Sequence, residues 1–130
     1  MNVFCLGSDQ IDWVWPRFEQ HIYRLERLGH IGADEIREDL KAAKRQLWGY
    51  QVGSEIIGIT ITRIAGKTCE IVAAAGRQSS SGQIEQVYRE IDAWARSIGC
   101  ERMRIIGRKG WLRKFPEFMQ TGIVIEKDLI

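Results

Sequence analysis

The sequence contains few of the residues from which disulfide frameworks and metal sites are built. Among its 130 residues are three cysteines and two histidines. Cys5, Cys69 and Cys100 are odd in number and far apart, which argues against a disulfide framework and against a Cys-x-x-Cys metal site. His21 and His30 form no nucleophile and base set with them. We therefore expect buried free thiols, histidines at the surface or in packing positions, and no metal.

Long apolar runs and a strong net charge are also missing. No segment approaches the roughly 20 apolar residues that cross a bilayer. The first seven residues lack the basic start and the long apolar stretch of a signal peptide. The formal net charge is +2, which is too small by itself to indicate nucleic-acid binding. These absences favour a cytoplasmic protein that does not bind membranes.

What is present is an ordinary globular composition, with 45% hydrophobic and 28% charged residues. A chain of this length buries enough surface for one compact domain. No internal repeat, low-complexity tract or linker divides it. A single domain over residues 1–130 is predicted.

The hydrophobic periodicity predicts an α/β (α+β) fold with elements in the order β-α-α-β-β-β-α-β-α-β. Pro16 lacks the N–H of an interior helical hydrogen bond, so the first helix should begin near Trp13 to Trp15. The second helix is predicted from an apolar stripe formed by Ile36, Leu40, Ala43 and Leu47.

From Leu47 onward the apolar period changes to two. This pattern predicts an antiparallel meander with turns at Gly53-Ser54 and Ala65-Gly66-Lys67. A strongly amphipathic helix that stops at Gly99 comes next, and then a strand from Arg102 to Ile106. The last elements are a short helix from Lys109 to Met119 and a strand from Ile123 to Leu129, whose exposed edge would allow pairing into a dimer.

The run from Cys69 to Ile106 reads as strand, polar loop, helix and strand, with Gly76 to Gly82 as the loop. Small residues that lead into a helix N-terminus expose unpaired backbone N–H groups beside a partial positive charge. Such a turn binds phosphate groups, including those of coenzyme A. A solvated loop with a good helix cap explains the same residues.

The element order and this loop resemble the GNAT superfamily of acyl-CoA-dependent N-acyltransferases over essentially the whole chain. In that family the loop reads Gln/Arg-x-x-Gly-x-Gly/Ala. Arg77 and Gly82 match its first and last places, and Ser80 stands at the middle glycine. The resemblance implies a mixed, centrally splayed sheet with helices on both faces, and acetyl-CoA or another acyl-CoA as cofactor. It places the pyrophosphate on Arg77, Ser80, Ser81 and Gly82, and the pantetheine arm on the strand end Val72, Ala73 and Ala74.

The resemblance also implies acyl transfer to an amine by direct attack in a ternary complex, with Glu70 on the central strand as the base. A polar strand residue that merely faces solvent is the other interpretation of Glu70. Many family members use a tyrosine as the acid, in the helix after the fifth strand. Phe115 and Phe118 stand there in this sequence, and water can protonate the leaving thiolate instead.

Five short patches more specifically resemble small GNAT-like proteins of tailed bacteriophages. Some members of that group are regarded as acetyltransferases, whereas related folds occur as internal proteins of phage particles. The resemblance therefore implies either a phage-encoded acyltransferase in the host cytoplasm or an inactive scaffold that contacts other virion proteins or nucleic acid in the particle. The patches are Val14-Trp15-Pro16, Asp34-Glu35-Ile36-Arg37, Gln46-Leu47-Trp48, Ala93-Trp94-Ala95-Arg96-x-x-Gly99-Cys100 and Gly107-Arg108-Lys109-Gly110-Trp111.

One stretch towards the C-terminus is strongly basic and is interleaved with Trp111 and Phe115. This pattern suits phosphate contacts and base stacking in single-stranded nucleic acid. The same cations fit the 3′-phosphate of the cofactor, and a charged strand edge with a solvated helix face is a third interpretation. The candidate contacts are Arg108, Lys109, Arg113 and Lys114.

Overall fold

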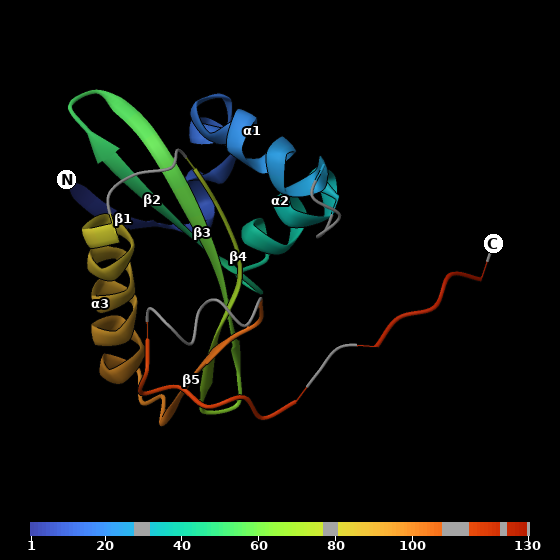
Figure 1. Ribbon diagram of the computed structural model, residues 1–130. Helices are drawn as coiled ribbons and strands as arrows, with labels where there is room; N and C mark the ends of the chain where they lie inside the picture. The colour runs from blue at the N-terminus through green and yellow to red at the C-terminus, as the bar shows by residue number, and fades with distance from the viewer. Residues whose placement is uncertain (28–31, 77–80, 108–114, 123–124, 130) are drawn as a thin grey trace.

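The computed structural model describes residues 1–27, 32–76, 81–107, 115–122 and 125–129. At its centre is a five-stranded sheet in the spatial order β1-β2-β3-β4-β5 (Figure 1). The strands β2, β3 and β4 form the predicted antiparallel meander, β1 is antiparallel to β2, and β5 lies parallel to β4. The strands are β1 (Asn2–Leu6), β2 (Gln46–Val52), β3 (Glu55–Ala65), β4 (Thr68–Gly76) and β5 (Arg102–Ile105).

Helices cover both faces of the sheet (Figure 1). The helices α1 (Ile11–Arg27) and α2 (Ala33–Lys41) pack on one face, and α3 (Ser81–Ser97) packs on the other. Two apolar cores result, because each helical layer buries its own stripe against the sheet. None of the described helices combines the length and apolarity needed to cross a membrane. The predicted mixed α/β fold class is confirmed.

Two glycines form the tight hairpins of the meander. Gly53 and Gly66 have φ of 61° and 62°, a left-handed conformation that glycine adopts without steric cost. Val52 pairs with Glu55 and Ala65 pairs with Thr68, so each loop contains two residues. Both predicted turns are confirmed.

The first long helix begins earlier than predicted. A 3-10 turn at Ser8–Gln10 leads directly into α1 at Ile11, and Pro16 lies inside the helix. The proline lacks the N–H that would donate to the carbonyl of Asp12, so α1 loses one hydrogen bond near its start. The first turn forms nevertheless because it buries Ile11 and Val14, which are 1% and 7% exposed.

The second helix ends earlier than predicted. Lys41 is its last residue, Ala43 has a left-handed φ of 57°, and Leu47 belongs to β2. The N–H of Lys44 donates to the carbonyl of Asp39 at 2.9 Å, a bond that closes the helix end. Leu47 lies in the same core as the apolar stripe of α2, which explains why the pattern seemed continuous.

The last two predicted elements do not form in the residues that the structure describes. Residues 115–119 form no helix and residues 125–129 form no strand, while 109–114 and 123–124 lie outside the described ranges. Ile125 and Leu129 are 82% and 89% exposed. Residues 125–129 therefore bury no apolar face that would hold them against the sheet, and the edge predicted for dimer formation is not formed there.

The three cysteines have different surroundings. Cys69 is buried, Cys100 is partly buried and Cys5 is exposed, so the prediction of buried thiols is right for Cys69 and wrong for Cys5. Burial, together with the nearby Cys100, raises the pKa of Cys69 to about 12.

We expect Cys69 to resist iodoacetamide at pH 8 in the native protein, because little of its thiol is ionised there and its side chain is inaccessible. Cys69 should become alkylated after unfolding in guanidinium, as peptide mass spectrometry would show. Alkylation at the same rate in both states would contradict this expectation.

Candidate functional site

β4 and β5 separate halfway along β4. Their pairing runs from Thr68 opposite Arg102 to Ile71 opposite Ile105, and the N–H of Ile106 donates to the carbonyl of Ile71 at 3.0 Å. β4 continues to Gly76, and in the described part of the chain no strand pairs with this second half on the β5 side. The sheet is therefore splayed between its fourth and fifth strands, as the family resemblance implied.

A β-bulge in β4 lies where the two strands separate. Thr62 pairs with Ile71 and Ile61 pairs with Ala73, so Val72 is the extra residue. A bulge bends its strand and exchanges the faces to which the following side chains point. Ile71 accordingly packs in the core under α3, whereas Ala73 packs in the core under α1 and α2. The bulge therefore bends β4 where its pairing with β5 ends.

The side chains predicted to contact the pantetheine arm lie on both sides of the sheet. Val72 and Ala73 pack against the core of α1 and α2. Ala74 faces the opposite way and lines a small apolar cavity of about 20 Å³ between β4, α3 and β5. All three residues lie on the half of β4 that no longer pairs with β5.

The open half of β4 leads towards the start of α3. Ser81 and Gly82 are the first two residues of this helix, so their backbone N–H groups are among those without an intrahelical partner. Arg77 and Ser80 lie outside the described residues. Arg24 on α1 donates to the carbonyl of Gly76 at 2.8 Å and fixes the end of β4. A free strand edge and a helix N-terminus thus follow one another along the chain.

An aromatic cluster packs beside the cavity. The ring of Tyr88 lies 4.6 Å from that of Phe115 and 5.7 Å from that of Phe118, measured between centroids. Burial raises the pKa of Tyr88 well above its usual range, and its hydroxyl donates to Asp92 at 3.2 Å. Sequence reasoning did not identify Tyr88 as one of the residues that line the cavity. The only available signal was its place on the apolar stripe of α3.

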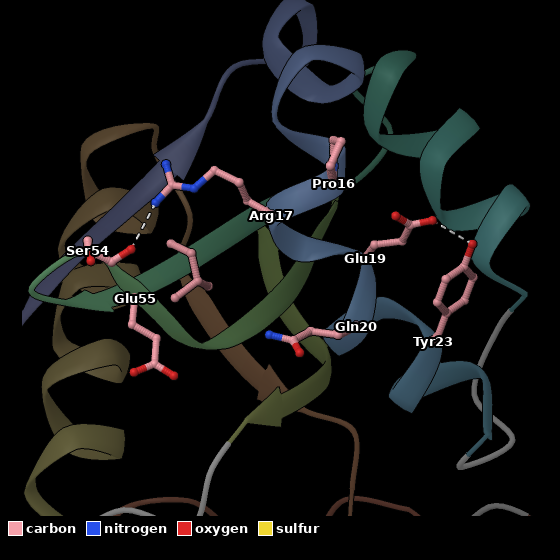
Figure 2. Close-up of a pocket in the computed structure, with 8 residues that line it drawn as sticks. Pro16, Arg17, Glu19, Gln20, Tyr23, Ser54 and Glu55 are labelled. Atoms are coloured by element: carbon pink, nitrogen blue, oxygen red, sulfur yellow. Dashed lines mark hydrogen bonds between the residues drawn. The ribbon is translucent and has the colours of Figure 1, made fainter.

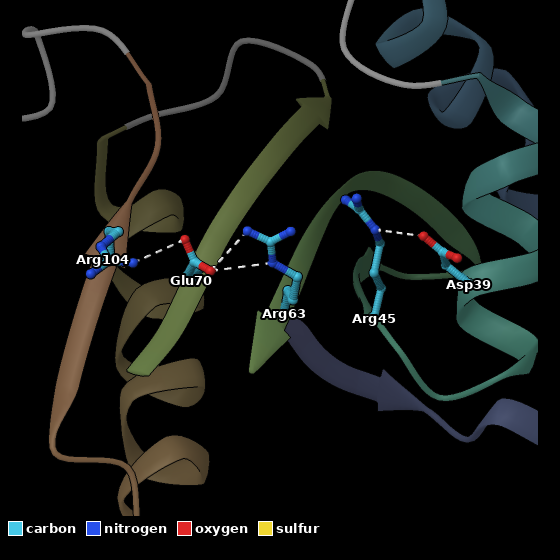
Figure 3. Close-up of polar contacts among 5 residues, drawn as sticks. All are labelled: Asp39, Arg45, Arg63, Glu70 and Arg104. Atoms are coloured by element: carbon cyan, nitrogen blue, oxygen red, sulfur yellow. Dashed lines mark hydrogen bonds and ion pairs between the residues drawn. The ribbon is translucent and has the colours of Figure 1, made fainter. Parts of the chain in front are cut away.

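Glu70 is buried between two arginines (Figure 3). Glu70 as a whole is 3% exposed. Arg63 on β3 donates through Nε and Nη2 to Oε1 at 3.2 and 2.9 Å, and Arg104 on β5 donates through Nη1 to Oε2 at 3.3 Å. The interpretation of Glu70 as a polar strand residue that merely faces solvent is therefore wrong. Its role as a base stays a prediction.

None of the four predicted phosphate contacts, Arg108, Lys109, Arg113 and Lys114, is among the residues that the structure describes. Arg102 and Arg104, at the start of the same basic stretch, are on β5. Within the described residues, no group of three or more His, Cys, Asp or Glu side chains could hold a metal ion.

A wider hollow of about 710 Å³ lies between α1 and the β2–β3 hairpin (Figure 2). Arg17 donates to the carbonyl of Ser54 at 3.4 Å across it, and the hydroxyl of Tyr23 donates to Glu19 at 2.9 Å. None of the residues that line this hollow lines the cavity between β4 and β5. It is a separate surface that sequence reasoning did not identify.

Known proteins resemble this chain in structure but not detectably in sequence. No protein-family model matches the chain, and no curated protein matches it. Among solved structures, an aminoglycoside acetyltransferase from an uncultured soil metagenomic sample, in complex with sisomicin, has a TM-score of 0.76 at 9% identity. The match covers 99% of this chain and 96% of the other.

Two further structures show the same likeness. The aminoglycoside N-acetyltransferase AAC(6')-Iy in complex with CoA has a TM-score of 0.69 at 12% identity, with 98% of each chain covered. A ribosomal-protein-alanine N-acetyltransferase from Brucella melitensis biovar Abortus 2308 has a TM-score of 0.64 at 8% identity, with 98% of this chain and 94% of that one covered. At such low identities the likeness concerns the fold, and the chain has the GNAT-like acetyltransferase fold.

Proposed function

We propose that the protein is an acyl-CoA-dependent N-acyltransferase of the GNAT superfamily. The observation that carries the proposal is the separation of β4 from β5 directly after Ile71, on a strand that leads to the start of α3. An extended ligand with an anionic end could pair with the free strand edge and place its anionic end at the helix N-terminus that follows. A protein of the same fold is in complex with CoA, which supports this class of ligand.

The residues at the opening fit the pantetheine arm of such a ligand. Backbone N–H and C=O groups on the free edge of Val72 to Ala74 can pair with the amides of the arm, as an added strand would. The side chain of Ala74 is only a methyl group, so it leaves space for the arm beside the apolar cavity. At the start of α3, the backbone N–H groups of Ser81 and Gly82, which have no intrahelical partner, can donate to the pyrophosphate.

An acyl-CoA would supply an activated thioester at this opening. The acceptor amine attacks the thioester carbonyl carbon, so a C–N bond forms, the C–S bond breaks, and water protonates the leaving thiolate. A backbone N–H of β4 donates to the carbonyl oxygen as negative charge develops on it. We assign the amine proton to Glu70, whose Oε2 accepts one bond in the described part of the chain, from Arg104.

Isothermal titration with acetyl-CoA tests the proposal. The wild-type protein should bind, and Ala74→Trp should weaken binding by at least about tenfold, because the indole would fill the space beside the free edge. Ala93→Trp is the matched control, since Ala93 is exposed on the same helix that borders the cavity. An absence of heat from the wild-type protein at millimolar acetyl-CoA would overturn the proposal.

The phage origin and the inactive virion component stay predictions from the sequence resemblance. A different experiment tests them, since a virion component would copurify with intact particles at a fixed stoichiometry. Binding of acetyl-CoA that Ala74→Trp removes would instead favour the enzyme.

A further inference from the structure

A charged row crosses three strands at one level of the sheet. Arg63 on β3 pairs in register with Glu70 on β4, and Glu70 pairs with Arg104 on β5. Cys69 and Ile71, the neighbours of Glu70, pack under α3, so the row lies on the opposite face, which α1 and α2 partly cover. Figure 3 shows the two arginines on either side of the carboxylate.

The row presents its positive groups to solvent. The side chain of Glu70 is 4% exposed, whereas those of Arg63 and Arg104 are 43% and 44% exposed. One carboxylate therefore lies beneath two guanidinium groups. A residual positive charge remains at the surface, and the buried carboxylate holds both guanidiniums in place.

Several donors of these arginines have no acceptor in the described part of the chain. Arg63 uses Nε and Nη2 on Glu70, and Arg104 uses Nη1. Each guanidinium carries five N–H groups in a planar fork, so both keep donors for a further anion. The adjacent Arg45 is already paired with Asp39 at 3.0 Å. Arg102 lies on the same face of β5 and is exposed.

The row lies where the two strands separate. Glu70 directly precedes Ile71, which accepts the last hydrogen bond between the two strands. If the thioester occupies the opening, as the proposed function requires, an amine that reaches Glu70 approaches from this face and meets the two guanidiniums first. A polycationic amine would be repelled there, whereas a carboxylate would find paired donors.

We propose that the acceptor is a small amine that carries its own carboxylate, as a free amino acid does, and that Arg63 and Arg104 bind this carboxylate. The inference rests on the proposed function and specifies its substrate class. Glu70 holds the two arginines in register and lies next to the amine.

The test compares the standard amino acids with their α-amides as acceptors, with acetyl-CoA as donor and loss of thioester absorbance as readout. The amide removes the negative charge and leaves the amine, which is less protonated than that of the acid, so intrinsic reactivity favours the amide. We expect the best acid to exceed its amide in kcat/KM by about tenfold or more, the range of one charge-assisted hydrogen bond.

Substitutions locate the effect. Arg104→Met and Arg63→Met should each raise KM for the acid by about tenfold to a hundredfold and leave the Kd of acetyl-CoA unchanged. Arg104→Lys keeps the charge beside Glu70 but loses the planar fork, so its KM should be intermediate. Arg102→Met is the control on the same strand face and should behave as wild type.

The two proposals fail in different ways. If acetyl-CoA binds but acids and amides respond equally, including not at all, the acceptor assignment is overturned and the acyl-CoA site stands. If acetyl-CoA does not bind, the proposed function is overturned and the acceptor assignment falls with it.

Discussion

Replacement of Gly58 by alanine should destabilise the protein by about 3 kcal/mol. A Cβ at this position would lie 2.2 Å from Cε2 of Tyr50, and the tyrosine ring is 4% exposed. The ring packs in the core under α3, and any shift weakens the hydrogen bond from its hydroxyl to the carbonyl of Ile59, now 3.0 Å long. For a domain of this length the midpoint of thermal unfolding should fall by roughly 10 °C.

Calorimetry or circular dichroism would measure this shift, with Gly122→Ala as the matched control. No heavy atom lies within 4 Å of a Cβ at Gly122, so that variant should unfold within about 1 °C of wild type. Gly76→Ala should also be destabilised, because its Cβ would lie 2.8 Å from backbone atoms of Gly58 and Ile57. An unchanged midpoint for Gly58→Ala would contradict the packing of Tyr50 described above.

Replacement of Glu70 by glutamine should lower kcat by at least about a hundredfold, the lower end of what a general base contributes. Glutamine keeps the size of the side chain and cannot accept the amine proton. Binding of acetyl-CoA should be retained, because the free edge of β4 begins after Ile71.

Glu101→Gln is the control for this experiment. Glu101 precedes β5 and forms an ion pair with Lys67 at 3.2 Å, in which both side chains are more than 70% exposed. An exposed pair of this kind contributes little, so Glu101→Gln should keep wild-type kcat. If Glu70→Gln keeps kcat within about threefold of wild type, Glu70 serves only as the partner of the two arginines.

Local signals predicted the centre of the fold well. The hairpins at Gly53 and Gly66 depend on left-handed glycines, and period-two alternation marks the strands beside them. The apolar stripe of α3 and its stop before Gly99, at a φ of 92°, depend on the helical period and on one glycine. These features involve residues close in sequence, so the pattern contains nearly all the information that specifies them.

The errors occurred where tertiary packing outweighed a local rule. Pro16 argued for a late helix start, but burial of Ile11 against the sheet holds the first turn of α1. Leu47 continued the stripe of α2 only because a helix and a strand share one core. A strand was predicted from Ile123 to Leu129, yet residues 125–129 have no partner to pair with in the described structure.

The sequence by itself determined the fold class, the order of the central elements and the position of the loop before α3. Only the tertiary structure showed that a bulge at Val72 bends β4 where its pairing with β5 ends, because a bulge is defined by the register with a partner strand. It also showed that Glu70 lies between Arg63, on the other strand of its hairpin, and Arg104, which is 34 residues away in sequence. The splayed strands and the charged row both depend on which strands are neighbours, and periodicity within one strand contains no information about its neighbours.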